Sequence, residues 1–164
     1  QGWVLDGVVS QSLAQTRALW RLREDISETL WHWQPYKNDI SVRVSKMSDF
    51  LAEVDQLVAA RYPDFEIVWY GHIGDGNLHL NILKPEDLPQ PEFFERCGIV
   101  SLEIGELLAR YGGSISAEHG VGLLKKSLLP YSRSPVEIAL MRSIKKTFDP
   151  KSILNPGKVF DALV

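Results

Sequence analysis

Cysteine, long apolar runs and blocks of one charge are scarce in this sequence, and each scarcity excludes a class of protein. The 18 basic and 21 acidic side chains are scattered along 164 residues and give a formal net charge of -3, which favours neither nucleic-acid binding nor an acidic disordered tail. No apolar run approaches the roughly 20 residues needed to cross a bilayer. We therefore expect a soluble chain with no nucleic-acid partner and no transmembrane helix.

The single cysteine, Cys97, rules out an internal disulfide. Because apolar residues such as Phe93 and Val100 recur around it, we expect a buried thiol. With 45% apolar residues, the chain is long enough to form one domain with a full hydrophobic core. The sequence begins at Gln1 and not at methionine, so we expect a piece of a longer protein whose targeting segment is out of view.

The most informative segment is 71–79, with the sequence GHIGDGNLH, in which His72 and His79 flank a glycine-rich stretch. A helix would also place residues seven apart on one face, but Gly74 and Gly76 favour a strand, a tight turn and a second strand. In that arrangement the two imidazoles flank the turn and can converge on one point.

A second glycine-rich segment, 116–122 (SAEHGVG), adds Glu118 and His119. Two neutral imidazoles and one carboxylate form a ligand set suited to zinc or a similar divalent ion, with positions left open for a substrate. His72, His79 and Glu118 are therefore candidate metal ligands, although each histidine taken alone could be an ordinary polar side chain.

Hydrophobic periodicity and capping signals predict an order of helices and strands. The predicted elements are a strand end at 4–9, a helix from about 10 to 30, a strand at 36–44, a helix from Ser48 as its cap to about 62, a hairpin of strands at 66–70 and 77–83, a helix from about 93 to 111, a short strand at 115, a helix at 135–148 and an extended tail at 153–160. Ser134 and Glu137 form the capping box of the last helix. Its expected buried stripe is Ile138, Met141, Ile144 and Phe148.

Helices alternating with strands, without internal repeats, predict an α+β fold in which helices pack on one face of an antiparallel sheet, in a ferredoxin-like arrangement. Alternation in the strand at 36–44 places Lys37 and Asp39 on one polar face, which could line a site. The preceding helix places Arg23 and Ser27, four residues apart, on a common face. Arg23 and Lys37 could equally be solvated surface charges.

Five motifs, in this order, resemble the C-terminal domain of the FAD-linked oxidases. These flavoenzymes include D-lactate dehydrogenases, glycolate oxidase subunits and D-2-hydroxyglutarate dehydrogenases. The motifs are 19–24 (LWRLRE), 36–41 (YKNDIS), 71–79 (GHIGDGNLH), 116–122 (SAEHGVG) and 149–158 (DPKSILNPGK). Together they span nearly the whole chain and are far more specific than any one of them.

The resemblance implies that residues 1–164 are a single C-terminal domain of a larger two-domain flavoenzyme, truncated at its N-terminal side. In that family a separate N-terminal domain carries most of the FAD, and this domain covers the isoalloxazine and forms the substrate pocket. The expected partners are that FAD-binding domain, a small 2-hydroxy acid such as 2-hydroxyglutarate or lactate, an unknown electron acceptor and, in a homodimer, a second copy. We expect the fragment alone to be inactive. The implied location is the cytoplasm or the inner-membrane periphery in a bacterium, and the mitochondrion in a eukaryote.

The resemblance also implies roles for individual residues. The metal ligands would be His72, His79 and Glu118; the substrate would contact Arg23, Ser27, Lys37 and Asn81; His119 would be the general base; and Asn155 would approach the flavin. In the implied reaction, hydride passes from C2 of the acid to the flavin. A divalent ion, expected to be zinc, would lower the pKa of the substrate hydroxyl, and an imidazole can take its proton because it titrates near neutral pH.

Two other classes of function stay open at this point. A metallohydrolase would use the same three ligands to activate water, although the helical His-Glu-x-x-His motif is absent. A non-catalytic ferredoxin-like module would only bind a small acid. The density of ionisable groups in the two glycine-rich segments argues against that last alternative.

Overall fold

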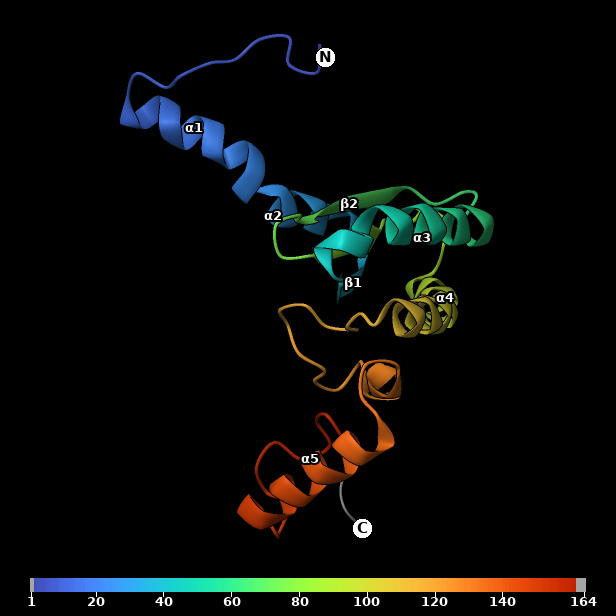
Figure 1. Cartoon of the computed structure of the whole chain (residues 1–164). Helices are drawn as coiled ribbons and strands as arrows, with labels where there is room; N and C mark the ends of the chain where they lie inside the picture. The colour runs from blue at the N-terminus through green and yellow to red at the C-terminus, as the bar shows by residue number, and fades with distance from the viewer. Residues whose placement is uncertain (1, 162–164) are drawn as a thin grey trace. The chain divides into compact units, whose positions relative to one another are not determined.

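The computed structural model describes residues 2–161. Residue contacts divide the chain into a first unit that ends at Pro35 and a second unit that begins at Tyr36. Figure 1 labels the helices and strands of both units, and each unit is described by itself. Within the described residues, no helix combines the length and the apolar character needed to cross a bilayer.

The first unit contains two α-helices and a 3-10 turn: α1 (Leu13–Glu24), α2 (Ile26–Leu30) and η1 (Trp31–Trp33). The expectation of one continuous helix from about 10 to 30 is wrong, because the backbone of Asp25 leaves the helical region, with ψ near 1°. Arg23 and Ser27 therefore belong to different helices. The expected strand at 4–9 does not form, since no described strand pairs with these residues.

The second unit is built on a three-stranded antiparallel sheet with the order β1-β3-β2. Its strands are β1 (Tyr36–Ser41), β2 (Ile67–His72) and β3 (Asn77–Ile82). Helix α3 (Met47–Arg61) connects β1 to β2, which lie on either side of β3, and α4 (Gln90–Tyr111) follows β3. This is the split β-α-β arrangement of ferredoxin-like folds. The expected fourth strand near 115 is reduced to one bridge between Ser41 and Ser114.

Helices α3 and α4 cover one face of the sheet, which confirms the predicted α+β fold. Every second residue of the strands faces them, as the pleat requires. The buried cluster includes Ile40, Leu80 and Ile82 from the sheet, Phe50, Val54 and Val58 from α3, and Phe93, Cys97, Val100 and Ile104 from α4. Cys97 is buried as expected. Ser48 does not cap α3, because the helix already begins at Met47 and Lys46 occupies the cap position.

The predicted hairpin is confirmed, and Gly76 fixes its turn beside the end of β1. Gly76 has φ +79°, and a Cβ at this position would overlap the carbonyl oxygen of Val42. The same close approach lets the amide of Val42 donate a hydrogen bond of 3.1 Å to the carbonyl of Gly76. Only glycine combines the left-handed backbone with this close packing. The turn that follows His72 is thereby held beside the end of β1.

The C-terminal part contains a 3-10 segment, η3 (Lys126–Tyr131), and the helix α5 (Pro135–Phe148). The predicted capping box of Ser134 and Glu137 is present. The expected buried stripe is wrong, because none of the residues of α5 is buried in the described chain. Residues 153–160 form turns instead of an extended tail, and Asn155 adopts a positive φ of 48°.

Candidate functional site

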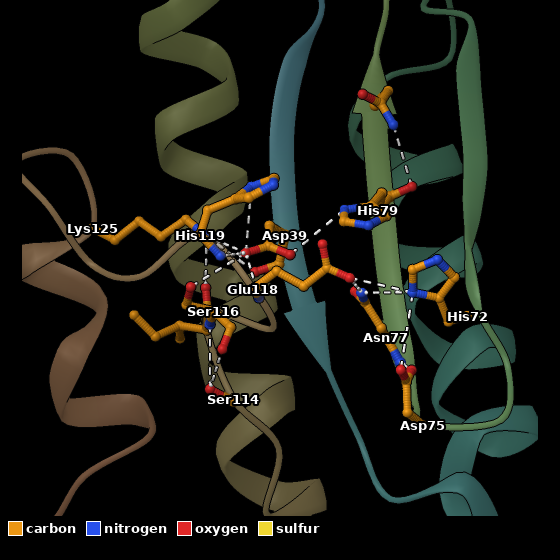
Figure 2. A network of polar contacts seen from close by, with 12 residues as sticks. Asp39, His72, Asp75, Asn77, His79, Ser114, Ser116, Glu118, His119 and Lys125 are labelled. Atoms are coloured by element: carbon orange, nitrogen blue, oxygen red, sulfur yellow. Dashed lines mark hydrogen bonds and ion pairs between the residues drawn. The ribbon is translucent and has the colours of Figure 1, made fainter. Parts of the chain in front are cut away.

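A polar site lies on the sheet face opposite helices α3 and α4. In the ladder, Asp39 of β1 pairs with His79 of β3, and Lys37 pairs with Asn81, so these four side chains share that face. The segment after α4 covers the same face and supplies Glu118, as Figure 2 shows. Residues from β1, from the hairpin and from this later segment therefore meet, as the two glycine-rich motifs predicted.

Asp39 is the centre of the site, and its side chain is almost fully buried. Its Oδ2 atom accepts hydrogen bonds from the backbone amides of Glu118 and His119, at 3.2 and 3.0 Å, and from the hydroxyl of Ser116 at 3.2 Å. Burial alone would raise the pKa of Asp39, but the two amide hydrogen bonds and the charge of Lys125 outweigh it and lower the pKa. Asp39 is therefore a carboxylate that fixes segment 114–119 on β1.

Lys125 also links β1 to the segment that follows α4. Its Nζ donates to the carbonyl oxygens of Asp39 and Ile115, both at 3.0 Å, and lies 3.7 Å from Oδ2 of Asp39. Burial lowers the pKa of Lys125, and the negative charge of Asp39 opposes that effect. The pair places the positive charge of a largely buried lysine beside the buried carboxylate.

His79 lies between Asp39 and the other rings of the site. Its Nδ1 is 3.5 Å from Oδ1 of Asp39, and its ring stacks on that of His119 with centroids 5.8 Å apart. Burial lowers the pKa of His79, against the opposing charges of Asp39 and Glu118. The imidazole is therefore mostly neutral near pH 7, the form that can bind a metal or accept a proton.

His72 and Glu118 contact each other at the open edge of the site. Nδ1 of His72 lies 3.2 Å from Oε1 of Glu118, and the side-chain amide of Asn77 donates to the same carboxylate. Asp75 accepts a hydrogen bond of 3.0 Å from the amide of Asn77, which is the usual role of aspartate in a tight turn. Asn77 therefore links the hairpin turn to the segment after α4.

The three predicted metal ligands share one region but do not form a preassembled ligand set. The ring centroids of His72 and His79 are 6.5 Å apart, Nδ1 of His79 faces Asp39, and Glu118 faces His72. Over residues 2–161, no group of three or more His, Cys, Asp or Glu side chains is arranged to hold a metal ion. The donor chemistry suits a divalent cation, but the present arrangement does not.

The predicted substrate residues divide between the two units. Asn81 lies on the same strand face as His79, and its buried Oδ1 has no hydrogen-bond partner in the described structure. Lys37 shares this face through its pairing with Asn81. Arg23 and Ser27 belong to the first unit. Asn155 lies in the turns after α5, outside the network of Figure 2.

The network includes Asp39, Asn77 and Lys125, for which the sequence predicted no chemical role. Asp39 stood on the polar face of the predicted strand, so alternation placed it correctly without revealing its partners. Asn77 is adjacent to the predicted turn. No local sequence pattern marked Lys125, because its contacts depend on how the segment after α4 returns to β1.

Comparison with known proteins identifies the family of this chain. A sequence profile of the FAD linked oxidases, C-terminal domain, covers residues 1–159. The chain belongs to this family. It is 61% identical over 99% of its length to a D-2-hydroxyglutarate dehydrogenase of Stutzerimonas stutzeri (strain A1501), covering 35% of that protein, and 58% identical over 98% of its length to one of Xanthomonas citri pv. viticola, covering 34%. A mitochondrial D-2-hydroxyglutarate dehydrogenase of Danio rerio is 41% identical over 94% of the chain and 28% of that protein.

Family membership confirms the resemblance that the five motifs indicated. The chain spans about a third of the length of the bacterial relatives it matches. It corresponds to the C-terminal domain of an FAD-linked oxidase, and the matched region includes both structural units. The polar face of the sheet and its histidines therefore belong to a domain whose relatives are redox enzymes.

Proposed function

We propose that this chain is the substrate-binding domain of an FAD-dependent D-2-hydroxy acid dehydrogenase, with D-2-hydroxyglutarate as the preferred substrate and D-lactate as the alternative. The observation that carries the proposal is the convergence of His72, His79, Glu118 and His119 on one polar sheet face, in a chain whose relatives are named D-2-hydroxyglutarate dehydrogenases. The same family membership favours this function over a metallohydrolase or a non-catalytic binding module. We propose that residues 1–164 act as one domain, since the family match includes both units.

The reaction removes a proton from the hydroxyl and a hydride from C2 of the acid. FAD, held by the rest of the polypeptide, supplies the hydride acceptor. His119 is the proposed general base: its side chain is 63% exposed, while its backbone amide is fixed by Asp39. Its Nδ1 is 3.6 Å from Oδ2 of Asp39, so Nε2 is the nitrogen available to take the hydroxyl proton.

Binding of the acid is proposed to use the same sheet face. Lys37 provides a positive charge for a carboxylate, and the neighbouring Asn81 provides an amide. Arg23 and Ser27 are proposed to complete the binding set from the first unit, where Arg23 can bind a carboxylate through two parallel hydrogen bonds. Asn155 is proposed to contact the flavin.

We also propose that His72, His79 and Glu118 bind a divalent metal ion, with zinc the first candidate. The support is chemical: two imidazoles and a carboxylate lie in one region. Binding requires Glu118 and His72 to exchange their mutual contact for the ion. Elemental analysis of the purified whole enzyme and of a His79→Ala variant tests this directly. Equal, negligible metal in both contradicts the ligand assignment.

The function is tested with the whole polypeptide that includes the flavin domain. Reduction of an artificial dye is measured with D-2-hydroxyglutarate, D-lactate and other D-2-hydroxy acids, and with their L-enantiomers as controls. We expect turnover with one or more D-acids and at least a tenfold loss in His119→Gln, as for removal of a general base. Absence of turnover with every D-acid contradicts the proposal.

A further inference from the structure

The two carboxylate oxygens of Asp39 have different surroundings. Oδ2 accepts three hydrogen bonds, from the amides of Glu118 and His119 and from the hydroxyl of Ser116. Oδ1 is buried and has no hydrogen-bond partner in the described part of the chain. Its neighbour is Nδ1 of His79, 3.5 Å away. One oxygen is therefore saturated, and the other is aimed at a histidine of the site.

A buried acceptor without a donor is costly, by about 1–3 kcal/mol, and Asp39 is only 2% exposed. Nδ1 of His79 relieves that cost only when it carries the proton, because a neutral imidazole has one donor and one acceptor nitrogen. The distance of 3.5 Å is slightly long for a strong hydrogen bond. Hydrogen bonds of catalytic groups are often long before substrate binds and shorten afterwards.

We infer that Asp39 is a positioning residue that holds His79 in the tautomer with its proton on Nδ1. The Nε2 lone pair of His79 is then available to the substrate side, while Oδ2 fixes the backbone of Glu118 and His119. This inference deepens the proposed function and rests on it, because it assumes that His79 belongs to the proposed site. Carboxylates that orient an imidazole through its second nitrogen act in this way in many enzymes.

The ion pair with Lys125 accounts for a negative charge at this position, but neither that pair nor the hydrogen bonds at Oδ2 account for the Oδ1 that faces His79 and accepts no hydrogen bond from the described residues. The three donors at Oδ2 need one acceptor, and the amide oxygen of asparagine would provide it. Only the position of Oδ1, which faces Nδ1 of His79, must hold an acceptor. Asparagine would place its NH2 donor there. In an Asp39→Asn variant that keeps the Oδ2 contacts, the side-chain NH2 would face Nδ1 of His79 and move the ring proton to Nε2.

The test uses the whole flavoenzyme with 15N-labelled histidine, without substrate and after treatment with a chelator, so that no metal ion sets the tautomer. Loss of signals in His79→Gln assigns the resonances of His79. We expect the wild-type ring to be protonated on Nδ1 and the Asp39→Asn ring on Nε2. We expect kcat of Asp39→Asn to fall by at least about 100-fold with little change in KM, as for other wrong-tautomer variants.

The matched control is Asp55→Asn on α3, where the carboxylate accepts a hydrogen bond of 2.8 Å from Nε1 of Trp69. An amide oxygen can accept the same bond, so neither the His79 signals nor kcat should change. A wild-type His79 protonated on Nε2 overturns the inference without any variant, and so does an unchanged tautomer in folded Asp39→Asn. Absence of turnover with every D-2-hydroxy acid overturns the proposed function and leaves the tautomer measurement valid.

Discussion

Nδ1 of His72 lies 3.2 Å from Oε1 of Glu118, which joins the end of strand β2 to the segment that follows helix α4. Asn77 reinforces this junction through its own hydrogen bond to Glu118. Two motifs that are distant in sequence therefore form one surface. The junction is also the more exposed part of the site, since the side chains of His72 and Glu118 are about half exposed while Asp39 is buried.

Replacing Glu118 by glutamine tests the importance of this junction. The change preserves size but removes the negative charge beside His72, so we expect the whole enzyme to lose at least about 10-fold in kcat/KM, equivalent to about 1.4 kcal/mol of transition-state stabilisation. Dye-reduction kinetics measure the loss. The control is Glu95→Gln on the exposed side of α4, which should retain wild-type rates. If Glu118→Gln kept the same rate as this control, Glu118 would have no role in turnover.

Gly76→Ala tests the packing of the hairpin against β1. The new Cβ would overlap the carbonyl oxygen of Val42 in a left-handed backbone conformation, so we expect a loss of at least about 2 kcal/mol in the free energy of unfolding. Gly74→Ala is a matched control in the same turn, because its Cβ would meet no atom within 4 Å. Denaturant unfolding of both variants measures the difference. Equal stabilities would contradict the described turn.

The thiol of Cys97 should be unreactive in the folded protein. Burial in the core raises its pKa to about 11, so almost no thiolate is present near pH 8. We expect a thiol-specific reagent to label Cys97 slowly at that pH and rapidly after addition of denaturant. The rate of labelling, followed by mass spectrometry of the Cys97 peptide, measures this. Rapid labelling without denaturant would show that the core around α4 opens readily.

Asp149 should make stability depend on acid pH. The hydrogen bond from Lys145 lowers its pKa below the ordinary value of 3.8; burial opposes this, and the amides of Ile153 and Leu154 add to the lowering. Because the folded pKa is depressed, Asp149 contributes stability that is fully present above its ordinary pKa and is lost as pH falls through the folded pKa.

An Asp149→Asn variant isolates this contribution. We expect it to be less stable than wild type near pH 6, with a difference that shrinks as pH falls below about 3.8. Thermal unfolding followed by circular dichroism at several pH values measures the difference. A difference that stays constant over this pH range would mean that Asp149 acts through its shape and not through its charge.

The sequence correctly predicted those parts of the fold that depend on residues close together in the chain. The hairpin, the end of α4 at Gly112 and the capping box of α5 follow from glycine conformations, capping side chains and alternation. The stripe on α5 was predicted to be buried, but none of its residues is buried in the described chain. An amphipathic pattern indicates that a face is to be covered but does not supply the covering element. The continuous helix to residue 30 was also wrong, since periodicity continued through Asp25 while the backbone did not.

The site was only partly accessible from sequence. Glycine-rich turns with histidines marked His72, His79 and the Glu118-His119 pair, and the structure brings them together. The central position of Asp39 depends on the register between β1 and β3 and on the return of a segment from beyond α4. Neither is a local property of the chain, so no motif could reveal it.

The most direct test of the account is anaerobic mixing of the oxidised whole flavoenzyme with a D-2-hydroxy acid while the flavin absorbance is followed. D-2-hydroxyglutarate is the first substrate to try, and its L-enantiomer is the control. We predict loss of the oxidised flavin band with the D-acid, much more slowly in His119→Gln, and no loss with the L-acid. A flavin band that stays unchanged with every D-2-hydroxy acid would contradict the assignment of this domain to hydroxy acid oxidation.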